Sequence, residues 1–83
     1  MKTITEKTTK ILREDLKRKL AEFQIIDNRF QKKYGMTLDE FEKRNIVKEK
    51  GFSFEAESDY HEWDSAMDAV ETLRAKIKDL SEG

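Results

Sequence analysis

The sequence contains no cysteine, no proline and only three glycines among its 83 residues. Without cysteine, the chain can form neither a disulfide framework nor a thiolate metal site. With so few glycines and no proline, it lacks the turn residues that a many-stranded β fold requires. It also lacks an apolar run long enough to span a membrane, and its first residues lack the apolar stretch of a signal peptide. We therefore expect a soluble, cytoplasmic and mostly helical protein without a membrane partner.

Charged residues, in contrast, are abundant and unevenly distributed. They make up 42% of the chain, against about 25% in an ordinary globular protein. Residues 1–35 carry ten bases and five acids, residues 36–50 carry four of each, and residues 51–83 carry three bases and nine acids. Such a split predicts either two helices that lie side by side with complementary charge, or a face that binds nucleic acid or a basic protein. Acids such as Glu14 within the basic third favour the first interpretation and argue against nucleic acid as a partner.

Apolar side chains recur at helical spacing in two long segments, which predicts helices over residues 9–34 and 55–80. In the first segment they are Leu12, Leu16, Leu20, Phe23, Ile26, Phe30 and Tyr34. In the second they are Tyr60, Trp63, Met67, Val70, Leu73, Ile77 and Leu80. Residues 1–8 are rich in β-branched threonine, so we expect this stretch to fray.

A short helix over residues 38–48 is predicted between the two long ones. Thr37 and Glu40 form the Thr-x-x-Glu pattern of a capping box. Gly35 can take the left-handed conformation that ends the first helix. The sequence thus predicts a single all-α domain, an antiparallel hairpin of two long helices with a short middle helix.

Such a chain has too little interior for its aromatic side chains. A domain of this size buries only about 60% of its surface on folding, and two helices that lie side by side share only one narrow interface. We therefore expect association to complete the core, either as a homodimeric bundle or as a complex with another protein.

Few residues could carry out catalysis or bind a metal. His61 is the only histidine, and Ser58 stands where the Glu-x-x-His motif of di-iron bundles requires a glutamate. We therefore interpret Glu57, His61, Asp64 and Asp68, which share one helix face, as a solvated acidic stripe. Neither an activated nucleophile nor a phosphate-binding loop can be assembled from the remaining residues. No enzyme activity, catalytic residue, metal or cofactor is predicted.

Aromatic and acidic residues gather near the start of the last predicted helix. Trp and Tyr are typical anchors of protein interfaces, although at helical spacing they also build cores. Acids beside them would compete for the Lys and Arg groups with which a basic partner holds nucleic acid. The predicted partner-binding residues are Phe52, Phe54, Glu57, Asp59, Tyr60, Glu62, Trp63 and Asp64.

Two stretches, FQKKYGMTLDEF over residues 30–41 and SFEAESDYHEWDSA over residues 53–66, together resemble small antitoxin-like proteins of prokaryotic toxin–antitoxin loci. The resemblance covers about residues 12–75 and implies a non-enzymatic helical protein that binds and restrains a nuclease-type toxin. The chain departs from typical antitoxins because it has no recognisable DNA-binding domain and no tail rich in proline or glycine. The residues that match the pattern are Tyr34, Gly35, Met36, Phe41, Ser53, Glu57, Asp59, Glu62 and Trp63.

Two alternatives remain open. The first is a self-contained homodimeric bundle with a structural role, in which the aromatic residues form the core. The second is a DNA-binding regulator, because the opening residues Lys2 to Thr5 resemble the start of ribbon-helix-helix proteins. The predicted first helix is much longer than that fold allows.

Overall fold

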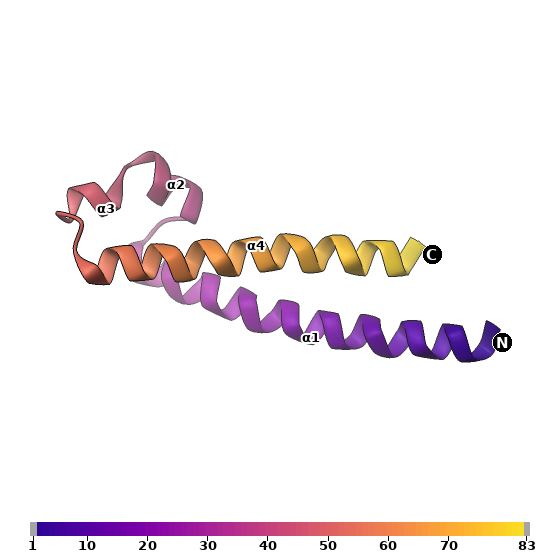
Figure 1. Cartoon of the computed structure of the whole chain (residues 1–83). Coiled ribbons are helices and arrows are strands. Elements are labelled where there is room, and N and C mark those ends of the chain that lie inside the picture. Colours follow the sequence, from indigo (N-terminus) through magenta and orange to yellow (C-terminus); the bar gives the residue numbers. More distant parts are fainter. Residues whose placement is uncertain (1, 83) are drawn as a thin grey trace.

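The computed structural model describes the backbone of residues 2–82 and the side chains of residues 7–81. Within this range the chain is helical and contains no strand, and its two long helices pack against each other, as predicted. The helices are, in chain order, α1 (Lys2–Tyr34), α2 (Leu38–Lys43), α3 (Ile46–Glu49) and α4 (Phe54–Glu82). The long helices run in opposite directions, with both chain ends at one end of the molecule, the open end, and with α2 and α3 at the other, the turn end (Figure 1).

The first helix is longer than the prediction of residues 9–34. It extends back to Lys2, and only Met1 of the stretch expected to fray lies outside the described backbone. Threonine lowers helix propensity by only a few tenths of a kcal/mol per residue, which is too little to end a helix by itself. At its other end Gly35 adopts the left-handed conformation (φ 68°). The N–H of Gly35 donates to the carbonyl of Gln31 at 2.7 Å, which closes the last turn.

The middle segment forms two short helices where residues 38–48 were predicted to form one. The capping box at the start of α2 is present, since Thr37 Oγ1 accepts the Glu40 N–H at 3.2 Å and Glu40 Oε1 accepts the Thr37 N–H at 3.3 Å. The break falls at Asn45, whose φ of 50° lies in the left-handed region. Asparagine tolerates this conformation better than most residues, so a single residue turns the chain between α2 and α3.

A Schellman motif ends α3. The N–H of Phe52 donates to the carbonyl of Val47 at 2.8 Å, and the N–H of Gly51 donates to the carbonyl of Lys48 at 2.9 Å. Gly51 supplies the left-handed residue that this motif requires (φ 68°). Phe52 is left-handed as well (φ 54°), a conformation that is unusual for so large a side chain.

The last helix begins with a serine cap. Ser53 Oγ accepts the N–H of Ala56 at 3.2 Å, which satisfies one of the free donors of the first turn. Glu55 and Glu57 lie in that turn, where negative charge complements the helix dipole. The helix therefore begins at Phe54, one residue before the predicted start.

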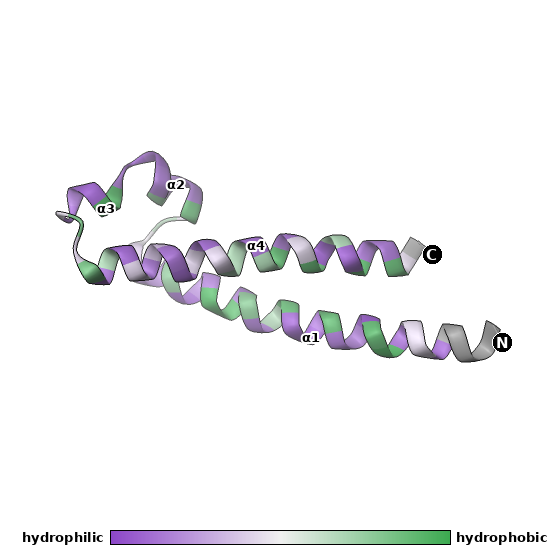
Figure 2. Ribbon diagram, viewed as in Figure 1, coloured by the Kyte–Doolittle hydropathy of each residue, from purple (hydrophilic) through white to green (hydrophobic). Residues whose placement is uncertain are grey.

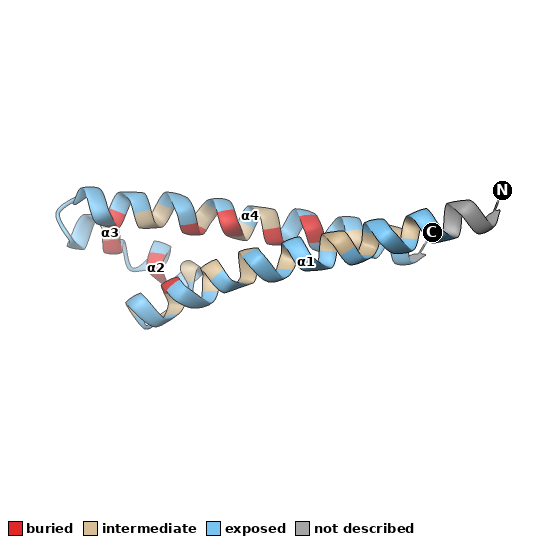
Figure 3. Cartoon of the chain, turned by 90° about the horizontal axis from the view of Figure 1, so that it is seen from below, coloured by how far each residue is buried: buried red, intermediate tan, exposed pale blue. Residues whose placement is uncertain are grey.

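The core is concentrated at the turn end and along α4. Hydrophobic residues recur along both long helices (Figure 2), yet α1 contributes only Phe30 to the buried residues among its described side chains (Figure 3). The molecule is elongated, with extents of 58 × 18 × 17 Å. The buried residues are Phe30, Phe41, Ile46, Ala56, Trp63, Ala66, Val70 and Leu73.

Candidate functional site

Trp63, which was predicted to anchor a partner, lies fully inside the chain's own core with 0% of its surface exposed. Its ring stacks on Phe30 and Tyr34 at centroid distances of 5.5 and 6.0 Å, and Phe41 meets it edge-on at 5.4 Å. The indole Nε1 donates to Asp27 Oδ1 at 2.8 Å. The side chain has no surface left for a partner. Of the two roles that helical spacing allowed, the structure therefore favours the core role.

Tyr60 is half-buried beside this core. Its ring stacks on Phe41 at a centroid distance of 6.0 Å, and its hydroxyl donates to Glu42 Oε1 at 3.2 Å. Burial raises the pKa of Tyr60, and the neighbouring carboxylate of Glu42 raises it further. Tyr60 thus connects α4 to α2 and stays a protonated hydrogen-bond donor at neutral pH.

Two of the predicted partner-binding acids are engaged by cations of α1. Asp59 Oδ2 accepts hydrogen bonds from Lys33 Nζ and from the Tyr34 hydroxyl, each at 2.6 Å. Glu62 pairs with Arg29 at 2.5 Å. These contacts join the basic first third of the chain to its acidic last third. At the turn end, the charge split therefore stabilises two helices that lie side by side.

The pKa values of the Lys33–Tyr34–Asp59 cluster reflect this pairing. Burial raises the pKa of Asp59, but the hydrogen bonds from Lys33 and Tyr34 outweigh it and hold the pKa below its usual range. Burial, together with the hydrogen bond to Asp59, raises the pKa of Tyr34 to about 12. Hydrogen bonds to Asp59 and Glu55 shift the pKa of Lys33 upward. All three groups therefore keep their neutral-pH protonation states, which suits a structural contact better than proton transfer.

The other four predicted residues lie on the surface of the molecule. Phe52 and Phe54, on either side of the Ser53 cap, are 59% and 87% exposed. Glu57 is exposed and Asp64 half-buried. The predicted site thus divides into two groups. In the inner group, Asp59, Tyr60, Glu62 and Trp63, each side chain is hydrogen-bonded to α1 or α2. The outer group, Phe52, Phe54, Glu57 and Asp64, lies at the surface without such a bond among the described side chains.

The outer group continues into an acidic face of α4, which we define as Glu57, Asp64, Asp68 and Glu71. These residues are three, four or seven positions apart, so they lie on one side of the helix. In the part of the chain whose side chains are described, no cation lies within ion-pairing distance of any of the four. Phe54 precedes Glu57 by three positions and therefore extends this face at its start.

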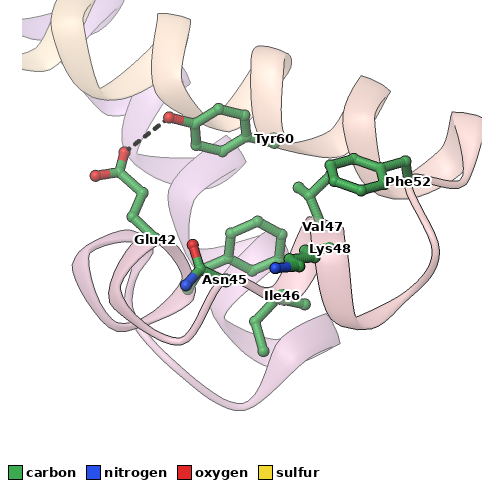
Figure 4. Close-up of a pocket in the computed structure, with 8 residues that line it drawn as sticks. Glu42, Asn45, Ile46, Val47, Lys48, Phe52 and Tyr60 are labelled. Atoms are coloured by element: carbon green, nitrogen blue, oxygen red, sulfur yellow. Dashed lines mark hydrogen bonds between the residues drawn. The ribbon is translucent and has the colours of Figure 1, made fainter.

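A surface cavity of about 290 Å³ lies at the turn end, beside the outer group. Figure 4 shows the Tyr60–Glu42 hydrogen bond on one side of it and the Phe52 ring on the other. Its walls are mostly apolar and come from α2, α3, the following turn and Tyr60 of α4. The lining residues are Phe41, Glu42, Asn45, Ile46, Val47, Lys48, Phe52 and Tyr60.

The described residues form neither a metal site nor a membrane-spanning helix. Among the side chains of residues 7–81, no group of three His, Asp or Glu residues is placed to hold a metal ion. None of the helices within residues 2–82 combines the length and the apolar character that crossing a membrane requires.

The residue that sequence reasoning missed is Asp27, the acceptor for Trp63. It lies on the apolar side of α1 between Phe23 and Phe30, and an acid in such a position is a signal that a buried donor faces it. Phe30 and Tyr34 were predicted to lie on that apolar side, but helical spacing does not indicate that they stack on Trp63.

Comparison with known proteins gives no relative for this chain. No family model, curated protein or solved structure matches it.

Proposed function

We propose that this chain is a non-enzymatic protein–protein interaction module of the antitoxin type, which binds and restrains a basic, nuclease-type toxin. The observation that carries the proposal is the outer surface at the start of α4. There Phe54, 87% exposed, lies three positions before Glu57, an acid that has no cation within ion-pairing distance among the described side chains. Covering a phenylalanine side chain is worth about 1.5–3 kcal/mol, and exposed aromatic residues are typical anchors of interfaces.

The acidic face supplies the electrostatic part of the proposal. Residues 51–83 carry nine acids and three bases, and the acids nearest the turn end that face α1 are already paired. The remaining acids, Glu57 and Asp64 foremost, are free to meet Lys and Arg side chains of a partner. On a nuclease those side chains hold nucleic-acid phosphates, so acids bound to them would block the substrate. The opposite charges of the two surfaces would also accelerate association of this chain with the nuclease.

The inner group has a supporting role in this proposal. Trp63, Tyr60 and Asp59 fix α4 against α1 and α2, and so hold the outer face in one orientation. Substitution of these residues would lower affinity by disturbing the fold, whereas substitution of the outer residues would lower it at constant stability.

The experiment begins with the protein that co-purifies with the tagged chain from its native cells, identified by native mass spectrometry. With the purified pair, Phe54→Ser should weaken binding roughly tenfold or more, as the loss of an aromatic anchor does. The matched control is Ile25→Ser, since Ile25 is also exposed (66%) but lies on α1. The association rate should fall as salt rises, because charge steers the encounter.

Three results would contradict the proposal. The first is a co-purifying protein without a basic nucleic-acid surface. The second is equal loss of affinity for Phe54→Ser and Ile25→Ser. The third is an association rate that does not change with salt.

A further inference from the structure

The open end of the molecule contains a groove between the two long helices, which we call the open-end groove. Its volume is about 370 Å³. Leu12 and Leu16 of α1 and Leu80 of α4 line it with apolar surface. Leu12 belongs to the apolar stripe of α1 yet is 49% exposed, so the seam between the helices is unfilled here. Four charged residues complete the lining, namely Asp15, Lys19, Lys76 and Asp79.

The chain has more surface than a compact protein of its mass. Its accessible surface is 6348 Å², whereas a folded monomer of 9.9 kDa has about 5,200 Å². The radius of gyration is 16.9 Å, against about 12 Å for a compact chain of this length. The excess of roughly 1,100 Å² is comparable to the roughly 800 Å² that each partner buries in a stable interface.

We propose that a second copy of this chain fills the open-end groove, so that the open ends of two chains form a four-helix bundle. In such a bundle a two-fold axis perpendicular to the long helices turns the second copy end for end. Because α1 and α4 run in opposite directions (Figure 1), this operation places α1 parallel to α4 of the partner subunit. Residues a constant distance apart in the sequence then lie at the same level.

The charges of the groove match this arrangement. Asp15 and Lys76 are sixty-one positions apart, and Lys19 and Asp79 are sixty positions apart. The two offsets differ by one position, about 1.5 Å along the helix axis. Within that distance, one register sets Asp15 opposite Lys76 of the partner subunit, and Lys19 opposite Asp79 of the partner subunit. The two-fold axis repeats both pairs, so four pairs of opposite charge form at once.

The same register brings apolar residues together. It sets Leu16 opposite Ile77 of the partner subunit and Leu20 opposite Leu80 of the partner subunit, again sixty-one and sixty positions apart. All four side chains are only half-buried in the single chain. An isologous interface must be self-complementary. This register meets the requirement because it pairs leucine with leucine or isoleucine, and acid with base.

A second copy fits this groove better than a basic partner does. The lining carries two acids and two bases, so it has no net charge to attract a basic surface, and Lys19 and Lys76 would repel one. The open-end groove is also remote from the outer residues Phe52 and Phe54 at the turn end. The inference therefore stands independently of the toxin proposal.

The test is sedimentation equilibrium of the purified chain and of two charge-reversal variants, Asp15→Lys and Lys76→Glu. The wild-type chain should dimerise. Each variant alone should dimerise roughly ten times more weakly, because two attractive pairs become repulsive. An equimolar mixture of the variants should recover the wild-type affinity, since each new charge then faces its opposite in the other chain.

The matched control is Lys48→Glu, which makes the same charge change as Lys76→Glu but on α3 at the turn end. It should leave dimerisation unchanged. Circular dichroism should show equal helix content for the wild type, Lys76→Glu and Lys48→Glu. Asp15→Lys also removes the ion pairs of Asp15 with Arg18 and Lys19 within α1, so Lys76→Glu carries the single-variant comparison. A wild-type chain that stays monomeric at high concentration would overturn the inference. So would variants that dimerise as tightly as the wild type, or a mixture that associates no better than its components.

Discussion

At the scale of single residues, the pairing of Trp63 with Asp27 is the most informative contact of the fold. The indole is fully buried, and its only donor finds a carboxylate oxygen at 2.8 Å. The other carboxylate oxygen accepts Gln31 Nε2 at 2.9 Å. An acid can occupy the apolar side of α1 because these donors replace the water it loses.

Asp27→Leu should show how much the hydrogen bond from Trp63 to Asp27 contributes to the free energy of unfolding. The change leaves the Trp63 N–H buried without an acceptor, which costs about 1–3 kcal/mol. We expect the free energy of unfolding to fall by that amount in urea titrations followed by tryptophan fluorescence. Asp27→Asn keeps one oxygen acceptor and should lose less than half as much. Equal losses for the two variants would show that the hydrogen bond does not stabilise the fold.

The Asp59 carboxylate should make stability depend on pH in acid. Its folded-state pKa lies below its usual range, so the unfolded chain binds the proton more readily. The stabilisation is fully present above the ordinary carboxyl pKa of about 4 and is lost as the pH falls through the folded value. Urea midpoints between pH 7 and pH 3 should therefore fall further for the wild type than for Asp59→Asn. Asp68→Asn, in the acidic face, should behave like the wild type.

At the scale of helices, the sequence allowed the long elements and their caps to be predicted but not the break between α2 and α3. Apolar periodicity extends over many turns in α1 and α4, and Gly35, Thr37 and Glu40 have specific capping roles. Between α2 and α3, Ile46 and Val47 continue a plausible helical pattern, and the break depends on the conformation of Asn45 alone. Periodicity over two turns cannot detect one left-handed residue.

The candidate site was only partly predictable for a related reason. Trp63 and Tyr60 belong to the apolar stripe of α4, and helical spacing alone correctly allowed them a core role. Phe52 and Phe54 have no such periodicity, so the sequence could not assign them to a face. Gly51 and Phe52 are left-handed in the turn before these rings, and φ angles are not visible in composition or spacing.

Phe52→Gly should separate stability from binding within this turn. Glycine adopts a φ of 54° without the steric cost that phenylalanine has there. The exposed ring, in turn, contributes little to the core of the free chain. We expect the free energy of unfolding to stay the same or rise by up to about 1 kcal/mol, while affinity for the co-purifying partner falls. Phe52→Ala keeps the strain but lacks the ring, and should lose affinity without gaining stability. A clear loss of stability in Phe52→Gly would show that the ring is part of the core.

At the scale of the whole molecule, burial is unequal between the two ends. Phe30, Phe41, Ile46 and Trp63 form one cluster at the turn end, whereas residues 7–29 of α1 contain no buried side chain. Local opening is least costly where few apolar contacts would be lost. The open end should therefore be the less stable half of a single chain.

Amide hydrogen exchange should show this difference directly. In Lys76→Glu, which leaves the ion pairs of α1 intact, amides of residues 10–20 should exchange faster than those of residues 26–34 at low concentration. In the wild-type chain at high concentration, the first group should gain protection, because the second copy covers it. Uniform protection along α1 in the dilute variant would mean that the open end is stabilised without a partner.

The position of the aromatic cluster also sets the order in which the chain can fold. The contacts at the turn end join residues close in sequence, such as Lys33 with Glu55, 22 positions apart. Leu12 and Leu80, which line the open-end groove, are more than sixty positions apart. Closing a short loop costs less entropy than closing a long one, so the aromatic cluster should form first and the two long helices should then join progressively outward. With no proline in the sequence, no slow isomerisation interrupts that progression. At concentrations at which the chain is monomeric, refolding should therefore be a single fast phase whose rate depends on Trp63 and Phe41 and hardly at all on Leu12 or Leu80.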